Sequence, residues 1–329
     1  MDYSSIRSEL TDYYMRTLAV SVENLRGKVY EKLDDFDREN PGLNSMKLKA
    51  QQYRTIAETF EPKLFDHLPF YYETGAIAAY GDGSYGRGGR HADGWIFDRN
   101  NHIVDDRFPE SRRLFSQNIS DILYLTCGPF FDIEHTPIPM KKIFSVGLSG
   151  VYEEAKEALV KCENDEERDF VMAAMAGLES IKLIGEKFAA EARSRLENET
   201  DPENIRCFTM IAETAGRVPW EAPKTFYEGM ATLAFMRKAI GSIEGYGFNS
   251  MGRPDLMIGP MLENDHENGA SRDEMYDLMC RFMLIRDCHV DHDKVMSGYS
   301  EYEYENAINI GGVDSEGNEV FNDVTKDVH

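Results

Sequence analysis

Apolar residues recur at steps of three and four along the first 60 residues of the chain. The recurring positions are Leu10, Tyr14, Leu18, Val22, Leu25 and Val29. This spacing places them on one face of a helix, because an α-helix completes a turn every 3.6 residues. Pro41 and Gly42 interrupt the pattern, and it resumes from Leu43 to Phe60. The pattern therefore predicts a helical N-terminal region over residues 1–60 with a break near Pro41.

Further helices are predicted from apolar spacing and from residues that favour helix ends. They cover residues 139–200 (one or two long helices), a segment that begins after Asp201, residues 224–241 and residues 271–287. Pro139 suits a first helical turn, and Asp201 is a helix cap because its carboxylate accepts from free backbone N–H groups. Ser271 and Glu274 have the spacing of a capping box.

Residues 61–135 have a different character, with glycine, aspartate, tyrosine and arginine in place of a regular apolar pattern. We predict loops and short strands here. The glycines at positions 81, 83 and 86 match the spacing of a dinucleotide-binding loop. Two more glycines follow at positions 88 and 89, where that motif needs a helix, so nucleotide binding is not predicted.

Two short segments are predicted as strands. Ile243 to Met251 alternates large and small residues, and Asn306 to Val313 is largely apolar and precedes a polar turn. Helices dominate by length, with a few short strands between them. This balance is compatible with an α/β architecture.

The charge of the chain excludes two classes of partner. Its 329 residues include 36 basic and 59 acidic ones, which gives a formal net charge of −23. Nucleic acids and anionic membranes attract basic surfaces, so neither is an expected partner. No signal peptide or membrane-length apolar run is visible, and five widely spaced cysteines are a poor disulfide framework. We expect a cytoplasmic protein.

Five motifs in the last third of the chain resemble landmarks of a known family. They are Gly216-Arg217-Val218-Pro219 with Ala222-Pro223, Thr225-Phe226-Tyr227-Glu228, Gly252-Arg253-Pro254-Asp255, Pro260 with Asp265 and Gly269, and Asn309-Ile310-Gly311-Gly312-Val313-Asp314 closing on Gly317. Their order and spacing resemble the pre-catalytic region of glycyl radical enzymes, the pyruvate formate-lyase-like family. Upstream, the histidine, proline turn and Gly-Leu-x-Gly within residues 135–150 resemble the same family.

The resemblance implies an α/β fold, the helix-rich N-terminal half of a ten-stranded β/α barrel. We expect a single domain over residues 1–329. It would contain a helical N-terminal region at 1–60, a Gly/Arg-rich loop region at 61–135 and a helical and half-barrel region at 136–329. An isolated half-barrel would expose sheet edges and an apolar face, so it would need a partner, a lid or self-association.

The family's chemistry requires two residues that we do not find in this chain. A cysteine in a Gly-Cys-x-Glu-type loop becomes a thiyl radical, and a glycine in a C-terminal Arg-Val-Ser/Ala-Gly-Tyr motif stores the radical. None of the five cysteines lies in such a loop. Gly298 precedes a tyrosine, but its motif carries an extra residue and comes before the Gly-Gly-Val-Asp landmark. No catalytic residue is therefore assigned.

The resemblance implies that the chain is the N-terminal portion of a glycyl radical lyase, of the formate C-acetyltransferase or diol dehydratase kind, acting in anaerobic metabolism. It would form part of the barrel and pocket and be inactive alone. The chain would bind no cofactor, and an S-adenosylmethionine/iron–sulfur activase would install the glycyl radical of the complete enzyme.

The implied partners are the C-terminal half of the enzyme, in the same or another chain, the activase, and a second copy in a homodimer. The sequence leaves open whether the chain is a shortened piece, a subunit of a split enzyme or a natural truncation. The alternative function is a non-catalytic anion-binding or scaffolding protein built on the same fold.

Four residues are candidates for the substrate pocket. Glu244, Phe248 and Ser250 lie in the predicted strand before Gly252, and in the family the matching strand lines the pocket. His289 is a candidate for the barrel mouth. Packing and turn roles are the alternative for Glu244, Phe248 and Ser250, and a solvated histidine at a helix terminus is the alternative for His289. Arg253 and Asp255 are predicted to form a structural ion pair.

A second candidate site is an anion-binding loop. Arg87, Arg90 and His91 stand among glycines, and the planar fork of arginine matches a carboxylate. Nearby acidic residues, Glu73 among them, are alternative partners for these arginines. Residues 288–293 also combine cysteine, histidine and aspartate, but no second cluster supplies the remaining ligands, so no metal site is predicted.

Overall fold

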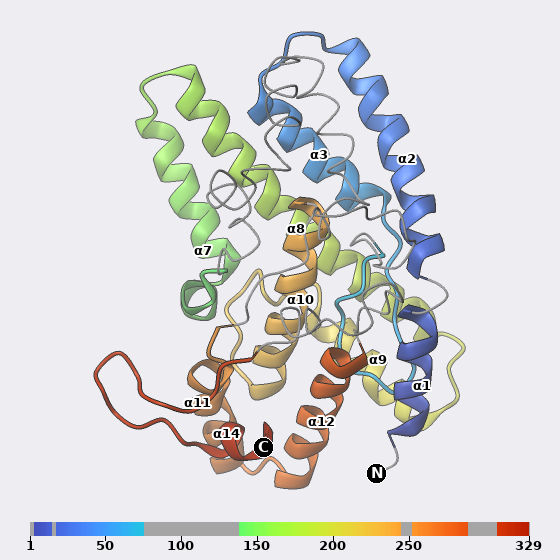
Figure 1. Cartoon of the computed structure of the whole chain (residues 1–329), viewed down its shortest axis with the longest axis vertical. Helices are drawn as coiled ribbons and strands as arrows, with labels where there is room; N and C mark the ends of the chain where they lie inside the picture. Colours follow the sequence, from blue (N-terminus) through green and yellow to red (C-terminus); the bar gives the residue numbers. More distant parts are fainter. Residues whose placement is uncertain (1–2, 15–17, 76–137, 245–251, 289–307, 329) are drawn as a thin grey trace, which may run out of the picture.

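The computed structural model describes residues 3–14, 18–75, 138–244, 252–288 and 308–328. Helices account for most of these ranges (Figure 1). They are α1 (Ser4–Asp12), α2 (Leu18–Glu39), α3 (Ser45–Thr59), α7 (Met140–Lys161), α8 (Asp165–Leu196), α9 (Pro202–Thr214), α10 (Phe226–Glu244), α11 (Pro254–Glu267), α12 (Arg272–Cys288) and α14 (Asp323–Val328).

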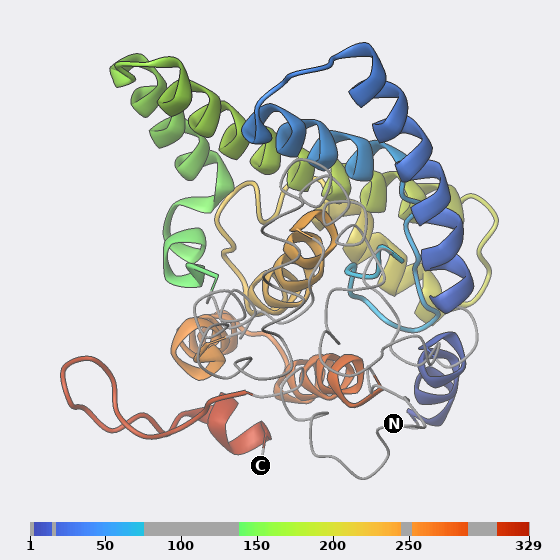
Figure 2. The same ribbon diagram turned by 45° about the horizontal axis from the view of Figure 1, so that its top comes forward.

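Helix α10 lies at the centre of the described part of the molecule. It contacts α3 and α8 on one side and α11 and α12 on another, as both views show (Figures 1 and 2). Its side chains are buried almost all the way round, including Met230, Leu233, Phe235 and Ala239. A helix that is apolar on every face is stable only inside a protein, which explains the unusually even hydrophobicity of this segment.

The predicted helices are confirmed where local signals set their ends. Residues 139–200 form the two helices α7 and α8, and α10 and α12 match the predicted segments 224–241 and 271–287. Asp201 caps α9, because its Oδ1 accepts from the N–H groups of Glu203 at 2.9 Å and Asn204 at 3.0 Å. No described helix is long and apolar enough to cross a lipid bilayer.

Helix α11 was not predicted from the sequence. It begins at Pro254 and contains Pro260, and proline inside a helical pattern argues against a helix. Pro254 occupies the first turn of the helix. A backbone N–H has no acceptor within the helix at that position, so proline loses no hydrogen bond there. The helix continues through Pro260 because its buried face, with Ile258 and Leu262, packs into the core.

The predicted strands are not formed by the described residues. Ile243 and Glu244 belong to the last turn of α10, and residues 245–251 lie outside the described ranges. Residues 308–313 are irregular, with only an isolated bridge between Val313 and Glu319. Gly311 and Gly312 have φ of 73° and 82°, which is outside the extended region that a regular strand needs.

Residues 61–75 form a non-helical segment that enters the core from Leu64 onward, although Asp66 stays exposed. Leu64, Phe65, Phe70 and Tyr71 are completely buried. The Tyr71 hydroxyl donates to the carbonyl of Val218 at 2.8 Å, which satisfies its polar end. This part of the predicted Gly/Arg-rich loop region is therefore core structure, and residues 76–135 lie outside the described ranges.

A glycine in α7 lets two distant segments touch. Gly147 has φ 68° and ψ 176°, and a Cβ there would lie 2.4 Å from the carbonyl oxygen of Trp220. The next two N–H groups, of Leu148 and Ser149, donate to the carbonyls of Pro219 and Trp220 at 2.9 Å each. The Gly-Leu-x-Gly motif thus fastens α7 to the segment that follows the Gly-Arg-Val-Pro landmark.

Replacing Gly147 with alanine should lower the free energy of unfolding by about 2–3 kcal/mol, since this backbone region is almost restricted to glycine and the added carbon meets backbone atoms. Urea denaturation measures the change. Gly27→Ala is the control, because Gly27 is an exposed residue of α2 with open space around it. That change should be neutral or stabilising by up to about 1 kcal/mol. Equal effects of the two substitutions would contradict the steric explanation.

Candidate functional site

The candidate site residues fall at or beyond the edges of the described ranges. Phe248, Ser250, His289, Arg87, Arg90 and His91 lie outside the described residues, so their assignments stay predictions. Glu244 was predicted in a strand, but it is the last residue of α10. The structure describes the three points from which the chain leads to these residues, namely Gly75, Glu244 and Cys288.

A buried ionic cluster lies beside the first of these points. Lys238 Nζ lies 3.1 Å from Glu73 Oε2, and the two side chains are only 4% and 1% exposed. The hydroxyl of Tyr14 donates to the same carboxylate oxygen at 2.8 Å, and the N–H of Gly75 donates to Oε1 at 2.8 Å. We call Tyr14, Tyr72, Glu73 and Lys238 the Glu73 cluster.

The tyrosines of the Glu73 cluster remain protonated. Burial, followed by the negative charge of Glu73, raises the pKa of Tyr14 well above its usual value. Burial also raises the pKa of Tyr72, whose hydroxyl lies 3.4 Å from that of Tyr14. Tyr14 is therefore available as a hydrogen-bond donor to Glu73 over the physiological pH range. The ammonium group of Lys238 also lies 5.5 Å from the centre of the Tyr14 ring.

Further buried polar contacts join this cluster to the end of α10. The hydroxyl groups of Thr74 and Ser242 are hydrogen-bonded to each other, and Ser242 Oγ lies 2.6 Å from the carbonyl oxygen of Lys238. Gln52 Nε2 donates to the carbonyl of Ile243 at 2.7 Å. These contacts hold residues 73–75 against the last turn of α10. Each of the two segments is followed in the chain by candidate site residues.

The first family landmarks fasten the start of α10. Arg217 and Glu228 form an ion pair, and the N–H of Glu228 donates to Thr225 Oγ1 at 3.2 Å. Asp265 Oδ2 accepts from the N–H of Phe226 at 2.7 Å. The landmarks around positions 217, 228 and 265 therefore meet at one helix N-terminus, where carboxylates and hydroxyls satisfy N–H groups that have no partner within the helix.

The last landmarks meet at Asp255. Arg253 forms the predicted ion pair with it, with Nε and Nη2 each 2.9 Å from a carboxylate oxygen. Gly311 N–H donates to Asp255 Oδ2 at 2.7 Å. Burial raises the pKa of Asp255, but the hydrogen bonds from Arg253 and Gly311 outweigh it, and the pKa is lowered overall. The ionised carboxylate thus joins the Gly-Arg-Pro-Asp and Gly-Gly-Val-Asp motifs.

A second buried network surrounds Arg281, a completely buried arginine of α12. Its guanidinium lies 2.9 Å from Asp277 and 2.8 Å from Glu203, and donates to the carbonyl of His67. Burial raises the pKa of the neighbouring Cys207 to about 12. That sulfur is therefore a thiol, and the network joins α9, α12 and the core segment 61–75 without an evident chemical role. We call Arg281, Asp277 and Glu203 the Arg281 network.

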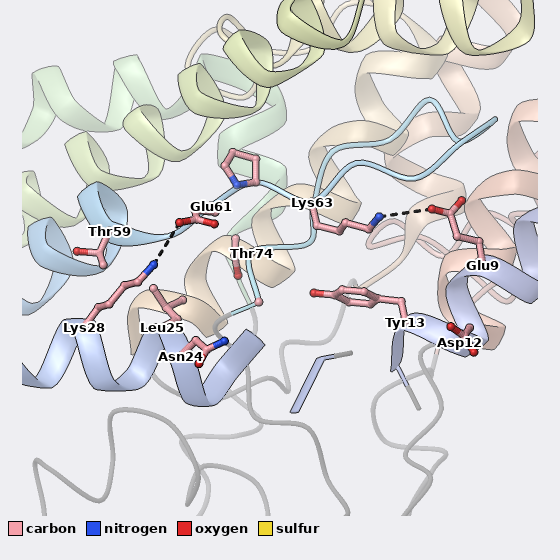
Figure 3. Close-up of a pocket in the computed structure, with 12 residues that line it drawn as sticks. Glu9, Asp12, Tyr13, Asn24, Leu25, Lys28, Thr59, Glu61, Lys63 and Thr74 are labelled. Atoms are coloured by element: carbon pink, nitrogen blue, oxygen red, sulfur yellow. Dashed lines mark hydrogen bonds and ion pairs between the residues drawn. The ribbon is translucent and has the colours of Figure 1, made fainter. Parts of the chain in front are cut away.

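A cavity of about 440 Å³ lies between α1, α2 and the core segment (Figure 3). Ion pairs of Lys28 with Glu61 at 3.2 Å and of Lys63 with Glu9 at 3.4 Å lie along its wall. Thr74 and Gly75 also line it. No sequence pattern indicates this cavity, because its lining comes from separate segments of the chain. No group of three or more potential metal ligands occurs within the described ranges.

Comparison with known proteins gives the family. The Pyruvate formate lyase-like family matches residues 98–327 of the chain. The (2S)-3-sulfopropanediol dehydratase of Klebsiella oxytoca is 24% identical over 204 residues, which are 58% of this chain and 24% of that enzyme.

Solved structures match the fold over almost the whole chain. A glycyl radical enzyme from Archaeoglobus fulgidus has a TM-score of 0.69 at 19% identity, covering 98% of this chain and 45% of its own. A structure described as 1,2-propanediol dehydration in Roseburia inulinivorans has a TM-score of 0.71 at 18% identity, covering 99% and 45%. The chain therefore spans less than half of these enzymes, which agrees with the predicted helix-rich half of the barrel fold. Because the family match covers well over half of its residues, the chain belongs to the pyruvate formate-lyase-like family of glycyl radical enzymes.

Proposed function

We propose that this chain is the N-terminal part of a glycyl radical lyase that dehydrates a small vicinal diol, and that it is inactive alone. The observation that supports this most directly is the coverage of the fold match, 99% of this chain against 45% of the Roseburia structure. Two of the relatives named for a substrate act on diols, (2S)-3-sulfopropanediol and 1,2-propanediol, and others act on trans-4-hydroxy-L-proline and isethionate. The diol is the substrate class that we propose for this chain.

The role of this chain would be to build one wall of the reaction chamber. In the complete enzyme, a thiyl radical on the other part would abstract a hydrogen atom from the substrate. Such a species reacts with oxygen and with stray hydrogen donors, so the protein must enclose it. The buried Glu73 cluster supports this role, because it holds the end of α10 and the segment at Gly75 in a fixed relation through fully buried contacts.

The complete enzyme would have further partners. We propose that an S-adenosylmethionine/iron–sulfur activase installs the glycyl radical on the polypeptide that carries the glycine motif. A homodimer of the complete enzyme is the proposed assembly. The chain itself would hold none of the groups that generate the radical.

Co-expression tests the proposal. The chain is produced alone and together with the polypeptide encoded directly after it, in the same or an adjacent reading frame. Each preparation is treated anaerobically with the activase and S-adenosylmethionine. Electron paramagnetic resonance detects a glycyl radical, and an aldehyde assay detects dehydration of 1,2-propanediol or (2S)-3-sulfopropanediol. We expect both signals from the pair and neither from the chain alone. Turnover by the chain alone would refute the proposal, as would a neighbouring polypeptide without the cysteine loop and glycine motif.

A further inference from the structure

Residues 308–322 form an arm that projects from the helices beside α11 and α14 (Figures 1 and 2). The arm is fixed at its base. Gly311 N–H donates to Asp255, Arg253 Nη1 donates to the carbonyl of Val313 at 3.2 Å, and Asn322 Nδ2 donates to the carbonyl of Asp255 at 2.7 Å. Both ends of the arm are therefore held to α11 and to Arg253, the residue before it.

The tip of the arm is also ordered. The Asp314 side chain accepts from the N–H groups of Glu316 at 2.8 Å and Asn318 at 2.9 Å, and Asn318 Nδ2 donates to it at 2.9 Å. The N–H of Val320 donates to the carbonyl of Gly312 at 2.8 Å. An arm already held in one conformation loses little further entropy on binding, which favours affinity.

This ordered arm carries exposed apolar side chains. Val313 and Phe321 are each 58% exposed, and Leu256, at the start of α11, is 39% exposed. Residues 308–322 also contain three acidic residues, Asp314, Glu316 and Glu319, and no lysine or arginine. A binding partner that fits this surface has an apolar recess with basic residues at its rim, because aromatic anchors inside charged rims dominate protein interfaces.

We propose that the arm is the docking element for the polypeptide that completes the barrel, with Phe321 as its anchor. This inference rests on the proposed function, and it specifies where the two parts meet. We choose this partner because of the coverage of the solved enzymes. Almost all of this chain matches each of those enzymes, but more than half of each enzyme has no counterpart in this chain.

The test compares two phenylalanines of similar exposure. Phe321→Asp changes the arm, whereas Phe170→Asp changes an exposed residue of α8 that is 62% exposed. Each variant is titrated by calorimetry with the neighbouring polypeptide used for co-expression. We expect the Kd to rise about tenfold or more for Phe321→Asp and to stay within about twofold for Phe170→Asp. Higher salt should also weaken the wild-type complex, because its acidic rim would face basic residues.

Each outcome decides a different point. If the wild-type chain binds and Phe321→Asp binds equally well, the docking inference fails while the proposed function stands. If the wild-type chain does not bind, both fail. If the chain alone forms a dimer that Phe321→Asp abolishes, the arm binds a second copy of this chain, and the docking inference is overturned. A thermal melt of each variant checks folding, and Val313→Asp, at the second exposed apolar position, repeats the test if Phe321→Asp does not fold.

Discussion

Replacing Lys238 with methionine is expected to lower the free energy of unfolding by about 3–5 kcal/mol. The reason is that the substitution removes the ammonium partner of a carboxylate that is almost completely buried, and an uncompensated buried charge is costly. The loss should appear as a lower midpoint in urea denaturation at pH 7.

Two controls isolate the buried pair. Lys28 forms an exposed pair with Glu61 at 3.2 Å, so Lys28→Met should cost no more than about 1 kcal/mol. The double substitution Lys238→Met with Glu73→Gln should recover most of the loss, because the neutral amide needs no ammonium partner and still accepts a hydrogen bond from Tyr14. If Lys238→Met costs no more than Lys28→Met, the Glu73 cluster is not a stabilising element of the core.

Replacing Arg281 with methionine should have an effect of similar size, about 3–5 kcal/mol. Arg281 is the largest completely buried side chain in the described ranges, and its loss leaves Asp277 and Glu203 without their shared buried partner. The expected consequence is loosening of α9 and α12 together. Urea denaturation gives the energy, and hydrogen exchange shows whether both helices lose protection.

Arg206 provides a matched comparison. It also pairs with Glu203, at 2.7 Å, and lies 3.6 Å from Asp277, but its side chain is 40% exposed. Arg206→Met should therefore cost about 1 kcal/mol, since solvent screens the pair and hydrates the carboxylates once the arginine is gone. Similar losses for the two arginines would show that burial does not determine the strength of this network.

Local signals explain what could be predicted from the sequence. Asp201 acts within three residues of its own position, and the Arg253–Asp255 pair spans two, so both were found from spacing alone. The Glu73 cluster could not be found in this way, because Glu73 and Lys238 are far apart in the chain and either residue alone suggests an exposed charge. Tertiary contacts therefore determine which charged residues are buried.

The wrong predictions also have physical causes. The run before Val313 is apolar, but two glycines with positive φ prevent a strand. Helix α11 contains Pro260 in its interior, and local rules count an interior proline against a helix. The five landmarks identified the family, yet within the described ranges they serve mainly to fasten helix ends and loops. The roles of Phe248, Ser250 and His289 in the pocket, and of Arg87, Arg90 and His91 in anion binding, remain predictions.

The contact between α1 and α12, which are far apart in the chain, has a consequence for synthesis of the protein. The hydroxyl of Tyr3, just before α1, donates to Asp277 of α12 at 3.0 Å, and α1 packs against α12. Ribosomes add roughly 5–20 residues per second, so α1 leaves the ribosome roughly 14–55 s before α12 exists to receive it. During that interval the apolar face of α1, with Ile6 and Leu10, has no native partner on α12, so this part of the core can close only after α12 has been made.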